Sequence, residues 1–143
     1  MIRYHNARLA AGVFFLVLLA ACTAPQTTAL RNALPAGVQQ HVELDQVVFF
    51  PQDEHQCGPA SLAMALQHAG RSIEPEQLKP FLYLPEKQGS LQAEMLAAAR
   101  RHGALAYMLE PELQDVLAEL AAGNPVVVLQ NLGLGWYPVW HYA

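Results

Sequence analysis

Three observations predict an α+β fold for this chain of 143 residues. β-branched and aromatic residues cluster early, at 46–50, and a second β-branched run begins at residue 126. Between the two runs, alanine- and leucine-rich stretches place apolar side chains three and four positions apart. The first pattern is typical of strands and the second of helices. A strand, a helical layer and then further strands, in that order, indicate an α+β domain.

Residues 1–21 have the layout of an export signal. Two arginines precede an apolar block, Leu9–Ala21, which at about 13 residues is too short to span a bilayer, since spanning takes roughly 20 residues. The block ends in the letters LAAC, which resemble a bacterial lipobox. That resemblance implies a lipid anchor on Cys22, which would become the mature N-terminus. The alternative is an ordinary secretory signal that leaves Cys22 as a plain thiol.

Thr23, rather than an aspartate, follows this cysteine. In the usual sorting pattern of Gram-negative lipoproteins this implies the outer membrane, so we expect a lipid-anchored protein that faces the periplasm. Removal of residues 1–21 leaves six basic against twelve acidic side chains, which argues against nucleic-acid binding through a basic face. Residues 22–43 are polar and predict a tether. The domain is expected over residues 44–143.

The first elements of this domain surround Cys57. A strand over 46–50 is stopped by a proline, and a helix over 57–68 is expected because Pro59 fits its first turn and Gly70 provides a left-handed stop. The other expected elements are a short helix over 75–82 broken near Pro80, a helix over 91–102 capped by Ser90, a strand over 104–109, an amphipathic helix over 111–120, a strand over 126–130 and a last apolar stretch over 139–143.

Cys57 is the candidate nucleophile. If Cys22 is acylated, Cys57 has no disulfide partner in the chain and is either a buried apolar residue or a reactive thiol. A thiolate is the reactive form, and a free thiol near pKa 8.5 is mostly protonated at neutral pH. The start of a helix favours an anion by up to about 1 kcal/mol. Lowering the pKa by two units requires roughly 2.7 kcal/mol, so a cationic partner is needed.

A histidine is the natural cation for this purpose, and it would later donate its proton to the leaving amine. Of the six histidines, two lie in the signal and the tether. His68 and His102 fall in the last turns of expected helices, where a cation complements the C-terminal dipole. His55 is two positions from Cys57, where a side chain usually points elsewhere. His141, between two aromatic residues of a strand-like run, remains the best candidate.

The run QDEHQCGPAS over 52–61, together with PVVVLQN and the distal WHYA, resembles the bacteriocin-processing peptidases of the papain-like clan, family C-thirty-nine, in their lipoprotein-borne variety. The resemblance covers about residues 44–143. It implies a papain-like fold, in which an N-terminal helical layer packs on an antiparallel sheet, and a cysteine peptidase that needs no cofactor. Its partner would be a peptide or protein substrate. The relatives cut leader peptides after a Gly-Gly pair, usually within a transporter that carries membrane and ATPase domains.

By position, the resemblance implies that Cys57 is the nucleophile and His141 the general acid and base. It also implies that Gln52 lends its side-chain amide to an oxyanion hole completed by the backbone N–H of Cys57, a donor type that contributes roughly 3 kcal/mol. The spacing from Gln52 to Cys57 is one residue shorter than in better-known members. Gln56 is the alternative donor.

One departure from the family concerns the residue that orients the histidine. The family has an Asp or Asn after it, whereas this sequence ends two residues past His141, and Asn124 and Asn131 both precede it. We therefore expect a fragment of a longer reading frame, with a sheet that is incomplete at its C-terminus and with further protein partners binding beyond Ala143. The competing hypothesis is a non-catalytic peptide-binding or scaffold lipoprotein that retains the fold.

Two smaller features near the C-terminus have simple interpretations. Trp136, Tyr137 and Trp140 either line a substrate groove or belong to the core, and the core is the commoner place for aromatic side chains beside a sheet. Cys57 with His55 and His141 matches no familiar metal-ligand spacing. We expect no metal.

Overall fold

A computed structural model of the protein describes residues 24–143. The expected signal over residues 1–21 and Cys22 lie outside the described residues. The chain divides into two compact units between Ala36 and Gly37, and the described part of the first unit contains helix α2, Pro25–Asn32, which the sequence interpretation missed. Pro25 stands at its first turn, where the missing N–H costs nothing. Within residues 24–143, no helix has the length and hydrophobicity to cross a membrane.

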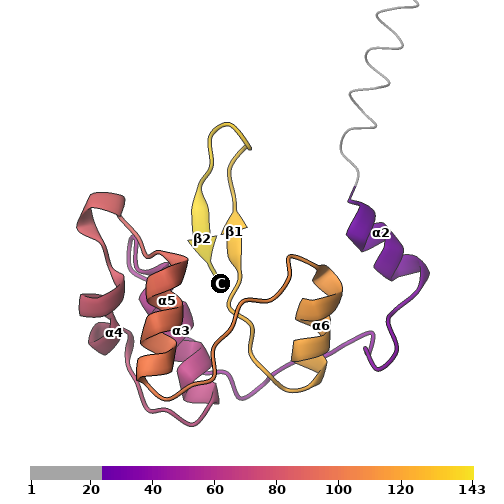
Figure 1. Cartoon of the computed structure of the whole chain (residues 1–143), viewed down its shortest axis with the longest axis horizontal. Helices are drawn as coiled ribbons and strands as arrows, with labels where there is room; N and C mark the ends of the chain where they lie inside the picture. Colours follow the sequence, from indigo (N-terminus) through magenta and orange to yellow (C-terminus); the bar gives the residue numbers. More distant parts are fainter. Residues whose placement is uncertain (1–23) are drawn as a thin grey trace, which may run out of the picture. The chain divides into compact units, whose positions relative to one another are not determined.

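The second unit, Gly37–Ala143, holds the remaining helices and strands of the described chain. They are α3 (Cys57–His68), α4 (Pro75–Leu82), the 3-10 turn η1 (Pro85–Lys87), α5 (Gln92–Arg101), α6 (Leu113–Ala121), β1 (Leu129–Asn131) and β2 (Trp140–Tyr142). Helices α3, α4 and α5 pack on one another, and α3 also contacts β2 (Figure 1). A helical layer against a small antiparallel sheet confirms the α+β class.

Helix α3 is the centre of the core. Its alanines and leucines favour helix formation, and Gly70, at φ +76°, ends it in the left-handed conformation expected from the sequence. Leu62 and Leu66 are buried against α4 and α5, and Pro59 in the first turn is buried as well. The buried cluster contains Leu62, Ala63, Leu66, Leu78, Leu82, Met95, Ala98, Ala99 and Tyr142. The strand-borne Tyr142 thus joins the hairpin to the helical layer.

The C-terminal hairpin pairs β1 and β2 in antiparallel register, with Gln130 opposite His141 and Leu129 opposite Tyr142. Its tip is ordered by Asn131, whose Oδ1 accepts hydrogen bonds from the backbone N–H groups of Gly133 and Val139, both at 2.9 Å. A Cβ on Gly133 would lie 2.8 Å from the Val139 nitrogen. The Gly-Leu-Gly run therefore serves a tight hairpin, which projects beyond α3 and α5 of the same unit in Figure 1.

Two expected strands are wrong. Residues 46–50 and 104–109 are not in a ladder, and the strand expected over 126–130 is shifted to Leu129–Asn131. A strand is stable only where another strand satisfies its backbone groups. Within residues 24–143 the one sheet is the β1–β2 pair, so β-branched and aromatic composition alone does not produce strands elsewhere.

Three local expectations about helices and aromatics are also corrected. Leu91 rather than Ser90 is the N-cap residue of α5. Helix α4 continues through Pro80, because this proline lies in the last turn, where its missing N–H removes a single intrahelical bond. The three C-terminal aromatics do not belong to the core. They are exposed by 83%, 69% and 61% at Trp136, Tyr137 and Trp140.

Candidate active site at the start of helix α3

Cys57 is the first residue of α3, as the sequence predicts. Its side chain is half-buried and packs against the buried cluster, so the thiol is both supported and accessible. Gln56 precedes it at the N-cap position, with its N–H bonded to the Asp53 carbonyl at 3.1 Å and its carbonyl accepting from Ala60. The N–H groups of the first helical turn have no intrahelical partner, so this end of α3 presents partial positive charge to the sulfur.

Gly58 determines how closely the start of α5 approaches this turn. A Cβ on Gly58 would overlap Ser90, with the Ser90 Cβ only 2.6 Å away, and would lie 3.4 Å from the Met95 sulfur. The absence of a side chain at residue 58 therefore lets the start of α5 lie directly against the start of α3. Packing alone thus explains the glycine of the Cys-Gly-Pro sequence, whether or not Cys57 is a nucleophile.

The loop before Cys57 carries the two glutamines considered as oxyanion donors. Gln52 is exposed, whereas Gln56 is half-buried at the helix cap and makes no side-chain cap hydrogen bond. His55 adopts a left-handed backbone at φ +62°, and its Nε2 lies 3.5 Å from the Glu54 carboxylate. Gln52 therefore lies at the surface of the loop, and of the two glutamines Gln56 is the one at the helix start.

His141 lies on β2, the strand that contacts α3. Neighbouring side chains of a strand point to opposite faces. Because Tyr142 is buried toward the helices, the half-buried His141 lies on the other face of the hairpin. The structure brings α3, which bears Cys57, against β2, which bears His141. Because His141 lies on the face opposite to Tyr142, a direct pair between its imidazole and the thiol stays a prediction.

The other polar candidates have structural partners. Asn131 orders the hairpin tip, and Asn124 donates from Nδ2 to the Glu119 carboxylate at 2.7 Å. His68 Nε2 lies 3.0 Å from the Gly123 carbonyl, where it ties the end of α3 to the end of α6. In the described part of the chain, no group of three or more His, Cys, Asp or Glu side chains is placed to hold a metal.

The sequence interpretation missed two residues at this site, Tyr142 and Glu94. Tyr142 is 5% exposed, and burial raises the pKa of its hydroxyl above the ordinary value, as do the nearby Cys57 and Glu94 in that order. Glu94 sits in the first turn of α5, where an acid usually serves the helix dipole at the surface. Instead its Oε2 is buried. No pattern in the sequence indicates that Tyr142 lies close to both Cys57 and Glu94.

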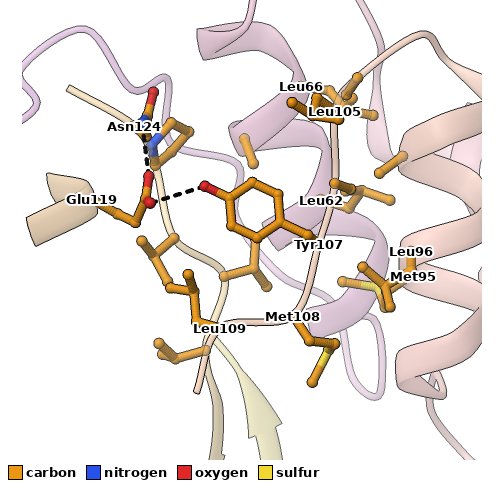
Figure 2. Close-up of a pocket in the computed structure, with 18 of the residues that line it drawn as sticks. Leu62, Leu66, Met95, Leu96, Leu105, Tyr107, Met108, Leu109, Glu119 and Asn124 are labelled. Atoms are coloured by element: carbon orange, nitrogen blue, oxygen red, sulfur yellow. Dashed lines mark hydrogen bonds between the residues drawn. The ribbon is translucent and has the colours of Figure 1, made fainter. Parts of the chain in front are cut away.

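Tyr142 also borders a cavity of about 750 Å³ (Figure 2). Apolar side chains of α3, α5 and the extended segment 104–109 line it, among them Leu62, Leu66 and Met95. In the same wall, the Tyr107 hydroxyl donates to Glu119 Oε1 at 2.9 Å. This volume falls in the range of small-ligand and side-chain pockets.

A family model described as "Peptidase_C39 like family" matches residues 44–143. The chain belongs to this Peptidase_C39-like family. The match contains all elements from α3 to β2, and with them Cys57 and His141. Neither the curated proteins nor the solved structures that were compared gave a match.

Membership of the Peptidase_C39-like family supports part of the expectation drawn from the sequence motifs. It indicates a cysteine-type peptidase as the general activity and a peptide or protein as the class of substrate. The half-buried thiol at a helix start is suited to such a reaction, because it is accessible and lies beside the partial positive charge of the helix end.

Proposed function

We propose that this chain is a cysteine peptidase of papain-like fold that hydrolyses peptide bonds through a Cys57 thiolate, with His141 as its general acid and base. The observation that carries the proposal is the position of Cys57. It is the first residue of a helix whose partner strand bears His141, within the region that matches a peptidase family.

The proposed reaction has two steps. The Cys57 sulfur attacks the scissile carbonyl carbon, the C–N bond breaks, and protonated His141 gives its proton to the leaving amine. Water then attacks the thioester at Cys57 while His141 takes the proton, which releases a carboxylate and restores the thiolate. The backbone N–H of Cys57 stabilises the oxyanion, with the side-chain amide of Gln52 or Gln56 as its second donor. In either role the amide has to turn toward the sulfur when substrate binds.

The first experiment measures iodoacetamide alkylation of Cys57 against pH, on the full chain with Cys22→Ala so that one thiol remains. We expect a midpoint well below the free-thiol value near 8.5, and its loss in His141→Ala. His55→Ala is the matched control, because it removes the imidazole that is nearest in sequence. A free-thiol midpoint in all three proteins would refute the ion pair and favour the scaffold hypothesis.

The second experiment tests the reaction itself, on a set of fluorogenic peptides that includes Gly-Gly before the scissile bond. We expect cleavage by the unmodified chain, none by Cys57→Ala or His141→Ala, and a loss of roughly 100-fold or more in kcat for the glutamine that supplies the oxyanion donor. Gln52→Ala and Gln56→Ala are compared for this purpose. Full activity of Cys57→Ala would disprove catalysis at this residue.

The proposal also places the protein on the periplasmic side of a bacterial outer membrane, anchored by an acylated Cys22. The lipobox-like residues before Cys22 and Thr23 after it support this location. Metabolic labelling with a radioactive fatty acid should mark the protein and should fail in Cys22→Ala. Equal labelling of both proteins, or labelling of neither, would contradict the anchor.

A further inference from the structure

Buried polar atoms gather beside the first turn of α3. The Ser90 hydroxyl, Glu94 Oε2 and the Tyr142 hydroxyl are each inaccessible to solvent and have no hydrogen-bond partner among residues 24–143. Most buried polar groups in proteins are partnered, so three such atoms in one neighbourhood require an explanation. A Cβ on Gly58 would overlap Ser90 and meet Met95, so the start of α5 lies close to the turn that begins with Cys57.

The Ser90 and Tyr142 hydroxyls can both donate a hydrogen bond, and of the two it is Tyr142 on which Cys57 acts electrostatically. Its ring belongs to the buried cluster against which Cys57 packs. Its hydroxyl lies within electrostatic reach of two acceptors, Cys57 on α3 and Glu94 on α5, and is bonded to neither. Burial, first, and these two neighbours raise the pKa of Tyr142, so the hydroxyl stays protonated throughout the neutral range. It is therefore a permanent donor with a choice of acceptor.

We propose that the Tyr142 hydroxyl is a positioning hydrogen-bond donor to the Cys57 thiolate, and that the Glu94 carboxylate competes with the sulfur for the same proton. This rests on Cys57 being the nucleophile of the proposed function. A neutral thiol is a weak acceptor and a thiolate a strong one, so the hydrogen bond forms as the sulfur ionises. The half-buried Cys57 side chain turns to the hydroxyl, because the tyrosine ring is held in the core.

The two neighbours of Cys57 then act in opposite directions. Donation from Tyr142 stabilises the thiolate, whereas the negative charge of Glu94 opposes a second negative charge nearby and draws the hydroxyl away. The other ionisable groups of these elements are Asp53, Glu54 and His55 in the loop before Cys57, and His141 on the hairpin face opposite to Tyr142. Of these, His55 and Glu54 already face each other at 3.5 Å.

The test is the pH dependence of Cys57 alkylation in the full chain that carries Cys22→Ala. Tyr142→Phe keeps the ring and removes a hydroxyl that has no partner within the described chain, so the fold should persist, as a thermal melt checks. We expect alkylation at pH 7 to slow about three- to tenfold and its midpoint to rise. Glu94→Gln should shift the midpoint downward. A role confined to packing would not produce shifts of opposite sign.

The chain offers a matched control in Tyr107 and Glu119, the tyrosine–glutamate pair of the cavity. Tyr107→Phe and Glu119→Gln make the same chemical changes and should leave the alkylation midpoint where it was. An unchanged midpoint in folded Tyr142→Phe overturns the proposal, as do shifts of the same sign in the two site variants. Should Tyr142→Phe fail to fold, a midpoint in Glu94→Gln that is unchanged or raised overturns it.

His141→Ala, measured in the same assay, separates this proposal from the proposed function. A midpoint that responds to Tyr142→Phe but not to His141→Ala refutes the Cys57–His141 ion pair and leaves the donor role of Tyr142 standing. A midpoint that responds to His141→Ala but not to Tyr142→Phe supports the ion pair and refutes the donor role of Tyr142.

Discussion

Two tyrosine–glutamate neighbourhoods of this protein are built from the same groups under opposite conditions. Tyr107 is exposed by 52% and its hydroxyl is fully engaged by Glu119, which Asn124 also holds. Tyr142 is almost fully buried, and within residues 24–143 neither its hydroxyl nor the buried oxygen of Glu94 has a partner. Both tyrosines have a raised pKa, at Tyr107 chiefly through the hydrogen bond to Glu119 and at Tyr142 chiefly through burial.

The Tyr107–Glu119 hydrogen bond is therefore a structural contact, whereas the unpartnered Tyr142 hydroxyl is a candidate for a role in the chemistry of the site. A satisfied hydrogen bond at the surface is replaced by water at little cost when it is lost. A buried donor that is left unsatisfied lowers stability, so each such group requires an explanation. We call α3, α4 and α5 around Tyr142 the closed region, because they hold most of the buried cluster. We call α6 and segment 104–109 around Tyr107 the open region, because none of their residues is buried.

The largest expected effect tests this division into a closed and an open region. Leu66→Ala removes a side chain that is 1% exposed in the closed region and should lower the free energy of unfolding by about 2–5 kcal/mol. Leu105, exposed by 91% in the open region, is the control, and Leu105→Ala should change the free energy of unfolding by less than about 0.5 kcal/mol. Urea unfolding measures both. Similar losses would show that the two regions are equally packed.

An intermediate effect tests the contact between α3 and α5 beside Cys57. Gly58→Ala places a methyl group on Ser90 and should destabilise the fold by about 1–3 kcal/mol, because the start of α5 has to move. Gly135→Ala at the hairpin tip introduces the same methyl into open space. Thermal melts of the two variants give the comparison. A Gly58→Ala protein as stable as Gly135→Ala would mean that the two helix starts are not held together.

The smallest expected effect appears at high pH. In the folded protein the pKa of Tyr142 lies above the ordinary value of 10.0 that it has when unfolded. Its contribution to stability is thus fully present below pH 10 and is lost as the pH rises through the folded value. Between pH 9 and pH 11, the free energy of unfolding measured in urea should fall less in Tyr142→Phe than in the unmodified protein. Tyr107→Phe, whose hydroxyl is exposed, should retain most of the decline.

How much the sequence predicts depends on how local the determining interactions are. Helix α3 was predicted with its bounds, because Pro59, the apolar spacing and Gly70 act within the segment itself. The strands at 46–50 and 104–109 were wrong, because a strand depends on a distant partner that composition does not specify.

The candidate site shows the same division. The position of Cys57 at a helix start was predictable, whereas Tyr142, on which it acts, and Glu94, which acts on the same tyrosine, come from two other elements. Glu94 reads in the sequence as an ordinary first-turn acid. The burial of its Oε2 depends on contacts between elements that the sequence does not specify.

Pro59 has a further consequence for chemistry at this helix end. It is buried in the first turn and, as a proline, it contributes no N–H. The unpaired amides of this turn are therefore reduced to those of Cys57 and Gly58. Under the proposed mechanism the backbone contributes the Cys57 N–H to the oxyanion, and the side chain of Gln52 or Gln56 has to supply the second donor.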